Sequence, residues 1–549
     1  MSAKVRQLER HDDDRPHRLA RTLGTGIVLV AILIVATVTV LMPADLQRPA
    51  VAPSRPNIVL ITTDDQPVKL LWAMRRTRSV IGAQGTEFRR YYASFPLCCP
   101  ARATWITGQY AHNHGVIDNR AHNGGGYPAL RHPMDVLPAW LRSAGYETAL
   151  AGKWLHDYDS TENAPGWEVF HSLVIQSRYY DYALTDSNGG AVFFGDRTDD
   201  YLTDTLTTRF ALPFIRARAA SPRPFFLHVS YTAPHWGKGR NDRAGRRCAT
   251  PRPFRFVSAR PKPAKRHADA YRRAPLPQPP SFNERNLSDK PDSVANKPLI
   301  GRRGRRALAK RYRCELATLL AADEGIARIN RALIDAGIED ETVVIFTSDN
   351  GYMHGEHRLR GGKVHPYEEG VRVPLLIKGP GIPAGRRTLK PVADVDLAPT
   401  ILDLAGAGAT GRRLDGVSLL RTIRRPGSRK RALLLQARRR PTRSEEGRFA
   451  ARSWIGVRTR RYTYIERRSA TVQSPTADLP IAAGDRVARE LYDNKRDRFQ
   501  LHSRHRSRRY KKARTKLVEL LGKLRRCTGS RCIVEAAVPP PQRAQRPSR

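Results

Sequence analysis

Short apolar runs that end in polar residues recur along the middle of this chain. Four of them, at 57–62, 146–151, 224–230 and 342–347, are dominated by apolar and β-branched residues, as buried strands are. Apolar residues at helical spacing lie between them, most clearly over 316–337. Strands that alternate with helices predict an α/β fold, in which a mostly parallel sheet lies between helices.

Each of the four predicted strands is followed by side chains that can do chemistry. These are Asp64 and Asp65 after the first, Lys153 after the second, His235 after the third, and Asp349 with Asn350 after the fourth. Ligands of such sheets bind beyond the carboxyl ends of the strands. Any one of these residues could be an ordinary turn residue, but four strand ends in succession predict an active site at this edge of the sheet.

A second, smaller domain is predicted after the sheet region. Residues 394–406 have the pattern of one more helix, and the composition becomes strongly basic around 421–443. Three strand patterns and a helix pattern follow, at 432–436, 453–457, 462–465 and 511–524. We therefore expect a large domain over 56–420, a smaller α+β domain over 421–532 and a disordered tail over 533–549.

A long basic segment interrupts the large domain. Residues 236–313 are rich in proline and have few periodic apolar positions, and loops of this length are usually functional or disordered. The middle of the segment, 276–298, has fewer arginines and could wrap over a site. We expect the segment to be a basic insertion or lid.

The N-terminal region predicts a membrane anchor. Residues 24–42 are nineteen uncharged positions, which as a helix would span roughly 28 Å, close to the thickness of a bilayer core. Arg15, Arg18 and Arg21 precede them and favour a cytoplasmic N-terminus. We expect a basic cytoplasmic tail over 1–23, an uncleaved signal anchor over 24–42 and a linker over 43–55, with a cleaved signal peptide and secretion as the alternative. Either way, the large domain lies outside the cytoplasm.

The charge and the cysteines refine this picture. The 549 residues carry a formal net charge of +46, which attracts sulfated glycans, nucleic acid or anionic membranes, although an arginine-rich solvated surface is an equally open interpretation. Neither zinc-finger spacing nor an aromatic-basic RNA-binding signature occurs, so we expect no nucleic-acid partner. Disulfides Cys527–Cys532 and Cys248–Cys314 would suit an oxidising compartment, but the sequence leaves the pairing open.

The segment Pro96–Gly108 (PLCCPARATWITG) carries the strongest candidate chemistry. Pro100 suits the first turn of a helix, which places Cys98 just outside the helix N-terminus, where free N–H groups favour an anion or an activated nucleophile. Arg102 lies one turn further on and can reach back towards the same anion. The alternative is a buried cysteine beside a helix start. A bridge between the neighbours Cys98 and Cys99 would be strained.

Taken together, these segments resemble the type I sulfatases of the alkaline-phosphatase superfamily. The similarity runs over 55–532, and the matching segments occur in family order: NIVLITTDD, PLCCPARATWITGQY, GKWLHDY, TAPH, VIFTSDNG with GEHRLRGGK, and ELYDNKRDRFQL. The TGQY and HNH runs are most similar to N-acetylglucosamine-6-sulfatases and related heparan-sulfate sulfatases. The resemblance implies an alkaline-phosphatase-like large domain and an antiparallel sheet in the smaller domain.

The resemblance also implies the nucleophile and the metal site. Cys98, with Pro100 and Arg102 at the required offsets, would be oxidised to Cα-formylglycine by a separate formylglycine-generating enzyme. Ala101 and Trp105 stand where serine and leucine are usual. The implied ligands are Asp64, Asp65, Asp349 and Asn350, with the modified Cys98 near the ion. Three carboxylates and an amide suit Ca²⁺, with Mg²⁺ as the alternative.

The remaining roles follow from the same resemblance. One hydroxyl of the hydrated aldehyde, activated by Arg102 and the metal, would attack sulfur, and the other would expel sulfate. Lys153 and Lys363 would neutralise the sulfate oxygens, and His235 would protonate the leaving alcohol. Leu155 replaces a usual histidine, so the neighbouring His156 would deprotonate the second hydroxyl or bind substrate. We expect His112 and His114 to contact substrate or to cap a helix end.

We therefore expect a sulfuric ester hydrolase that acts on sulfated sugars or glycosaminoglycan-like substrates. A phosphonate monoester or phosphodiester hydrolase of the same superfamily is the alternative within enzymes, because sulfate and phosphate esters differ more in charge than in shape. A non-catalytic polyanion-binding sulfatase homologue is the alternative from another class.

Overall fold

The computed structural model describes residues 55–159, 162–237, 248, 260–424, 430–438, 453–468 and 487–542. The predicted cytoplasmic tail, the signal anchor and the linker up to residue 54 lie outside the described residues. Among the residues that the structure does describe, no helix is both long enough and apolar enough to cross a membrane.

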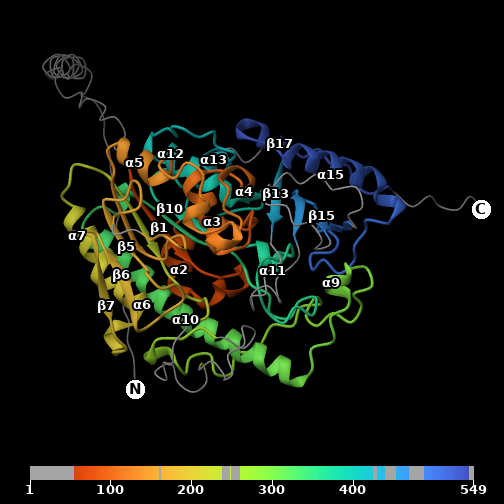
Figure 1. Ribbon diagram of the computed structural model, residues 1–549, viewed down its shortest axis with the longest axis horizontal. Coiled ribbons are helices and arrows are strands. Elements are labelled where there is room, and N and C mark those ends of the chain that lie inside the picture. Colours follow the sequence, from red (N-terminus) through yellow and green to blue (C-terminus); the bar gives the residue numbers. More distant parts are fainter. Residues whose placement is uncertain are drawn as a thin grey trace, which may run out of the picture. The chain divides into compact units, whose positions relative to one another are not determined.

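An eight-stranded mixed sheet organises the large domain (Figure 1), in the order β11-β2-β10-β9-β1-β8-β4-β5. Its strands are β1 (Asn57–Thr63), β2 (Thr86–Phe88), β4 (Glu147–Gly152), β5 (Val169–Ser172), β8 (Phe225–Ser230), β9 (Thr342–Ser348), β10 (Leu375–Lys378) and β11 (Arg386–Thr388). The run from β9 to β5 is parallel, and β10 is antiparallel to both neighbours. The four predicted strands are all in the parallel run, so the predicted α/β fold is confirmed.

Alternation along the central strand β1 builds a core on each face of the sheet. Val59 and Ile61 enter one apolar cluster, while Ile58 and Leu60 enter the other. Helix α10 (Arg302–Asp335) covers the first face, and α3 (Cys98–Thr107), α5 (Leu137–Ser143) and α12 (Leu397–Ala405) cover the second (Figure 1). Each fully buried side chain of this size contributes about 1.5–3 kcal/mol to folding, so both faces hold the sheet in place.

Strand register brings the carboxyl ends of four strands to one level. Thr62 of β1 pairs with Ser230 of β8, Thr63 pairs with Ser348 of β9, and Gly152 of β4 pairs with Ser230. The polar residues that follow these strands must therefore converge beyond one edge of the sheet.

Shorter elements complete the large domain. They are the helices α2 (Arg75–Thr77), α4 (Ala111–His114), α6 (Leu202–Thr205), α7 (Leu212–Arg218), α9 (Asp292–Ala295), α11 (Glu368–Val371) and α13 (Leu420–Arg424), and the paired strands β3 (Tyr91–Tyr92) with β12 (Val392–Ala393) and β6 (Tyr182–Asp186) with β7 (Gly190–Phe194). Short 3₁₀ and π turns connect them.

The predicted basic insertion is more ordered at its end than expected. Its last twelve residues, 302–313, are the start of α10, because Leu308 and Tyr312 pack into the core on the helical spacing. Upstream, the backbone N–H of Asn283 donates to Gly355 at 2.8 Å, and that of His357 donates to Ser281 at 2.7 Å. This part of the insertion thus lies against the loop after β9.

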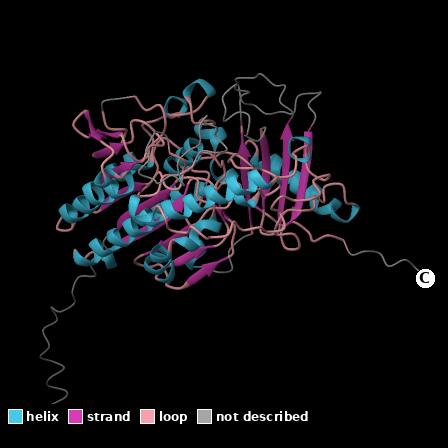
Figure 2. Ribbon diagram, turned by 90° about the horizontal axis from the view of Figure 1, so that it is seen from below, coloured by secondary structure: helices cyan, strands magenta, loops and turns pink. Residues whose placement is uncertain are grey.

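A five-stranded antiparallel sheet forms the smaller domain, and Figure 2 shows its strands side by side. The order is β16 (Val487–Asp493), β15 (Tyr462–Arg468), β14 (Trp454–Arg458), β13 (Arg431–Ala437) and β17 (Val534–Glu535), with α15 (Lys511–Leu524) packed against it. The predicted α+β domain is confirmed. The prediction of a disordered tail over 533–549 is wrong for its first residues, since β17 pairs with β13 and Ala536 is buried. Residues 543–549 lie outside the described part.

Both predicted disulfides form. Cys248 is bonded to Cys314 at the base of the insertion, and Cys527 to Cys532 beyond α15. Cys98 and Cys99 are free and buried. The cysteines therefore separate into two structural pairs and one adjacent pair with free thiols.

A buried ion pair within the smaller domain also contacts the large domain. Glu490 of β16 accepts hydrogen bonds from Arg467 of β15 at 2.6 Å and from Tyr367 of the large domain at 3.0 Å. Both charged side chains are almost fully buried. Removing one member would leave the other charged and unpaired in the interior, which typically costs about 3–5 kcal/mol.

We expect Glu490→Ala to lower the free energy of unfolding by about 3–5 kcal/mol, measured by urea denaturation followed by intrinsic fluorescence. Glu519→Ala is the matched control, because Glu519 is exposed and, among the described residues, its ion pairs are those with Lys516 and Lys523 along α15. The control should leave the midpoint unchanged. Equal midpoints for all three proteins would contradict the structural role of the pair.

Candidate active site

Cys98 is the first residue of helix α3, deep in the protein. Leu97 before it is extended, Pro100 occupies the first turn, and Gly108 ends the helix with φ at 63°. The prediction placed Cys98 just outside the helix, and the structure starts the helix one position earlier than expected. Its Sγ lies 3.4 Å from Oδ1 of Asp64 and 2.8 Å from Nζ of Lys363.

Two strand ends meet around this thiol. Asp64 and Asp65 follow β1 and His235 follows β8, and the possible ligand atoms of these three residues and Cys98 lie within 4.8 Å of one another. All four residues are buried. The convergence that the strand-end pattern predicts is therefore present.

Two unpartnered oxygens show that the cluster fits a hard cation. Asn350 donates through Nδ2 to Oδ1 of Asp65 at 2.7 Å, and this orientation leaves its own Oδ1 without a hydrogen bond. Oδ2 of Asp65 is also buried without a hydrogen bond. Buried polar atoms normally have partners, and carboxylate and amide oxygens are the ligands that Ca²⁺ and Mg²⁺ take.

Asp349, another predicted ligand, has both oxygens engaged. Oδ2 accepts from Nε and Nη2 of Arg102 at 3.1 and 3.0 Å, and Oδ1 accepts from the backbone N–H groups of Asp65 and Asn350 at 3.1 and 2.8 Å. Asp349 thus fixes Arg102 and the two neighbouring loops. Ligation of a metal by Asp349 would require some of these bonds to be exchanged.

Buried cations balance the carboxylates. Nζ of Lys153 contacts Oδ2 of Asp64, and Nζ of Lys363 donates to Oδ1 of Asp65 at 2.7 Å. Arg102 donates through Nη1 to Oγ of Ser230 at 2.6 Å. Sequence reasoning missed Ser230, although it is the last residue of a predicted strand and so had the same signal as the others.

The electrostatics of the site act against a reactive free thiol. Burial raises the pKa of Cys98, and the Asp64 carboxylate adds to this effect. Burial alone would raise the pKa of Asp64 too, but Lys153 leads a group of cations that hold it well below its usual range. Burial and Asp64 raise the pKa of Asp349 to about 6, and burial lowers that of His235 to about 4. An unmodified Cys98 is consequently a neutral, weakly nucleophilic thiol near pH 7.

Cys99 has a different environment. Its backbone N–H donates to Oδ1 of Asn119 at 2.9 Å, and its Sγ accepts from the backbone N–H of His156 at 3.1 Å. The thiol of Cys99 therefore binds the backbone of the loop after β4, while the thiol of Cys98 contacts the carboxylate of Asp64 and the ammonium group of Lys363.

His156 lies beside the cluster with no ring partner. Both ring nitrogens are buried without a hydrogen bond, and burial followed by the charge of Lys153 lowers its pKa well below the usual value. Leu155 is part of the apolar core, so the side chain at that position packs against other apolar side chains and takes no part in the proposed reaction. His156 keeps the free nitrogens that either predicted role requires.

His112 and His114 contact neighbouring segments of the fold and are not part of the cluster around Cys98. Nε2 of His114 lies 3.1 Å from Oγ1 of Thr104, and its Nδ1 accepts from the N–H of Val116 at 3.1 Å. Nε2 of His112 lies 2.8 Å from the carbonyl of Cys527. These three nitrogens are used within the fold around the short helix α4, while Nδ1 of His112 has no hydrogen bond within the described residues, so substrate contact by this pair stays a prediction.

A buried histidine under the site gives a pH-dependent stability. His228 of β8 is 3% exposed, and burial lowers its pKa to about 3. The folded protein keeps it neutral, whereas an unfolded histidine takes a proton near pH 6.5. Its contribution to stability is complete above about pH 6.5 and is lost as the pH falls towards 3, reaching a loss of about 2 kcal/mol at pH 5.

We expect the wild type to lose about 2 kcal/mol more stability between pH 7 and pH 5 than His228→Gln does, measured by urea denaturation at both pH values. His122→Gln, at an exposed histidine, is the control and should behave like the wild type. An unchanged pH dependence in His228→Gln would show that the histidine is protonated in the folded protein.

Known proteins are similar to this chain over most of its described residues. A family model described as "Sulfatase" matches residues 56–407, and one described as "N-sulphoglucosamine sulphohydrolase, C-terminal" matches residues 355–527. The extracellular sulfatase SULF-1 homolog of Drosophila melanogaster is 35% identical over 371 residues, covering 67% of this chain and 31% of its own length. The N-acetylglucosamine-6-sulfatase of Homo sapiens is 33% identical over 385 residues, covering 67% and 64%. The chain thus spans less than two thirds of either relative.

A solved structure supports the fold. It is described as BT4656 in complex with its substrate D-glucosamine-2-N,6-O-disulfate, and it matches with a TM-score of 0.66 and 23% identity, over 86% of this chain and 97% of that chain. At this identity, the match shows that the two proteins share a fold and nothing more.

Proposed function

Because the chain belongs to the sulfatase family, we propose that it hydrolyses sulfate esters of sulfated sugars or glycosaminoglycan-like substrates. The observation that carries the proposal is the placement of Cys98 at the start of α3, in contact with both Asp64 and Lys363. A nucleophile at a helix N-terminus, among buried cations, suits attack on an anionic ester.

We propose that Asp64, Asp65 and Asn350 hold a divalent cation, with Asp349 and the modified Cys98 next to it. Ca²⁺ is the proposed ion and Mg²⁺ is the alternative. The unpartnered oxygens of Asp65 and Asn350 support this assignment. When bound, such an ion draws negative charge from the sulfate oxygens.

We further propose that a formylglycine-generating enzyme oxidises Cys98, because Pro100 and Arg102 stand at the offsets that the sulfatase motif requires. The modified side chain supplies the oxygen nucleophile that the thiol cannot. Asp349 holds Arg102 in place, so the guanidinium lies at a fixed position beside the first turn of α3.

The lysines and histidines have separable roles in this proposal. Lys153 and Lys363 bring positive charge to the position that the sulfate oxygens would occupy. His235 is the proposed proton donor to the departing alcohol. Its Nδ1 donates to the carbonyl of Trp236 at 2.8 Å and burial keeps the ring neutral near pH 7, so Nε2, which lies 3.6 Å from Asp65, must take up a proton before it gives one to the alcohol. His156 has free ring nitrogens for a proton transfer or for a substrate hydroxyl.

The location of the protein is part of the same proposal. Two disulfides support an oxidising, extracytoplasmic setting. A membrane anchor at 24–42 lies outside the described residues and is kept as a proposal from the sequence. The domain limits of 56–420 and 421–532 are kept in the same way.

Turnover of matched ester pairs tests the function. We expect 6-O-sulfated N-acetylglucosamine and an aryl sulfate to be hydrolysed with a kcat/KM at least about 100-fold above that of the corresponding aryl phosphonate. An active site that matches the charge of the sulfate group can distinguish the two ester types by this factor. A preference for the phosphonate would favour the alternative hydrolase. Absence of turnover, with Cys98 shown by mass spectrometry to be modified, would favour a binding protein.

A further inference from the structure

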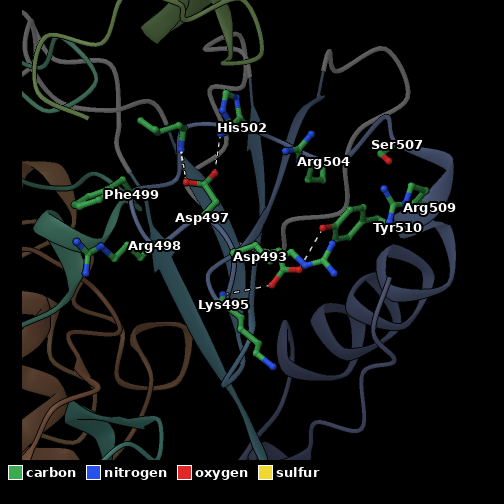
Figure 3. Close-up of a pocket in the computed structure, with 12 residues that line it drawn as sticks. Asp493, Lys495, Asp497, Arg498, Phe499, His502, Arg504, Ser507, Arg509 and Tyr510 are labelled. Carbon is green, nitrogen blue, oxygen red and sulfur yellow. Dashed lines mark hydrogen bonds between the residues drawn. The ribbon is translucent and has the colours of Figure 1, made fainter. Parts of the chain in front are cut away.

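A second charged cavity lies in the C-terminal domain, between strand β16 and helix α15 (Figure 3). It has a volume of about 510 Å³. None of the residues that line it belongs to the cluster around Cys98. Its size is in the range of sites that take a small ligand such as one or two sugar units.

Positive charge dominates this cavity. Residues 495–512 contain nine lysines and arginines and one acidic residue. The lining includes Lys495, Arg496, Arg498, Arg504 and Arg509. Within the part of the chain that the structure describes, none of these five side chains forms an ion pair.

The two acidic residues of the lining are engaged by the protein itself. Asp493 accepts from Arg461 at 2.8 and 2.7 Å and from the hydroxyl of Tyr510 at 3.2 Å. Asp497 accepts the backbone N–H groups of Leu501 at 3.0 Å and His502 at 2.8 Å (Figure 3). The carboxylates therefore hold the frame together and do not neutralise the lining cations, of which Arg509 also donates through Nε to the carbonyl of Gln542 at 3.2 Å.

The loop that carries these cations is fixed by both domains. Gln500 is buried with φ at 56°, and its Oε1 accepts the backbone N–H of Glu368 at 2.9 Å. The carbonyl of Leu501 accepts Nζ of Lys290 at 2.8 Å, and the N–H of Arg504 donates to Leu491 at 2.6 Å. A frame held at so many points loses little entropy when it binds a ligand.

We propose that this cavity binds a sulfated stretch of an oligosaccharide and holds a polymeric substrate at a second place. Arginine forks match the oxygens of a sulfate group. Phe499, with Arg498 stacked 4.6 Å from its ring centre, adds a flat apolar surface for a sugar ring. The other phenyl ring of the lining, that of Tyr510, is buried and bonded to Asp493, so the cavity offers no array of rings on which successive bases of a nucleic acid could stack. The inference rests on the proposed function, because the same polymer must reach both sites.

Binding to a non-reacting protein tests the cavity apart from catalysis. In a full-length Cys98→Ala background, we expect Arg498→Ala/Arg504→Ala/Arg509→Ala to weaken binding of a heparin-derived dodecasaccharide by about 10-fold or more and to reduce the salt dependence of the Kd. Calorimetry over a salt series measures both. The matched control is Arg75→Ala/Arg78→Ala/Arg216→Ala, which removes three exposed arginines of the large domain; it should change the Kd by less than about 2-fold.

Turnover supplies the second test. With Cys98 intact, we expect the triple variant to raise the KM for a sulfated oligosaccharide by about 10-fold and to leave kcat/KM for a monosulfated monosaccharide unchanged. If no sulfate ester is turned over, the proposed function fails while the binding measurement still decides the cavity. Equal weakening in the control, or an equal loss of binding to single-stranded DNA of the same charge, would overturn the glycan site.

Discussion

Replacement of Cys98 by alanine is expected to lower kcat/KM for a sulfate ester by about 10⁴- to 10⁶-fold, the range found when a covalent nucleophile is removed from an enzyme that depends on it. The side chain is the first residue of α3 and contacts Asp64 and Lys363, the two groups best placed to orient an oxygen nucleophile. The lysines and the cation site stay in place in the variant, so substrate binding should persist with little hydrolysis.

Cys99→Ala is the control that the sequence itself offers. Both thiols are buried, but the thiol of Cys99 contacts the backbone of His156 and none of the charged groups of the cluster. We expect this variant to keep its activity within about 10-fold, since only two weak thiol hydrogen bonds are lost, one from the N–H of His156 and one to the carbonyl of Asn119. Steady-state kinetics with both variants, and mass spectrometry of the peptide that contains residues 98 and 99, provide the measurements. Full activity of Cys98→Ala would refute the nucleophile assignment, and oxidation found only at Cys99 would move it.

The predictable part of this molecule is the part that follows strand order. Asp64 and Lys153 could be placed near each other because parallel strands deliver their carboxyl ends to one edge of a sheet, and the register of β1, β8 and β4 does so. The helix 511–524 and three strands of the smaller domain, β13, β14 and β15, were likewise visible as local periodicity, whereas β16 and β17 were not predicted. The start of α10 was not, since residues 302–307 are mostly arginine and glycine and carry no apolar signal.

The unpredictable part depends on contacts far apart in the sequence. His112 looked like a candidate for substrate contact, but its partner is the carbonyl of Cys527, 415 positions away. Asp349 was expected as a free ligand, yet it holds Arg102 through a contact across 247 positions. Pattern reasoning identifies the residue types that can do chemistry, while the tertiary fold decides which of them are used for packing.

Removal of divalent cations is expected to abolish ester hydrolysis, and loss of one proposed ligand to weaken cation binding strongly. Oδ1 of Asp65 accepts from Lys363 and Asn350, while its Oδ2 has no hydrogen bond. Asp65→Asn removes the negative charge of a proposed ligand. Loss of a residue that only orients a ligand typically weakens metal binding by about 10- to 100-fold, and we expect Asp65→Asn to weaken Ca²⁺ binding by more than that. Calorimetric titration of the chelator-treated protein measures this without any turnover.

Asp157→Asn is the matched control for this change, because Asp157 is a partly exposed carboxylate paired with Arg120 and has no contact with the cluster. It should bind Ca²⁺ as the wild type does. Because an ion that binds only the folded state stabilises it by mass action, Ca²⁺ should also raise the unfolding temperature of the wild type and of Asp157→Asn, and raise that of Asp65→Asn much less. Identical Ca²⁺ affinity in Asp65→Asn would show that the unpartnered oxygens of Asp65 and Asn350 hold no metal. The three buried cations around Cys98, which are Lys153, Lys363 and Arg102, would then have to neutralise the sulfate charge without a metal.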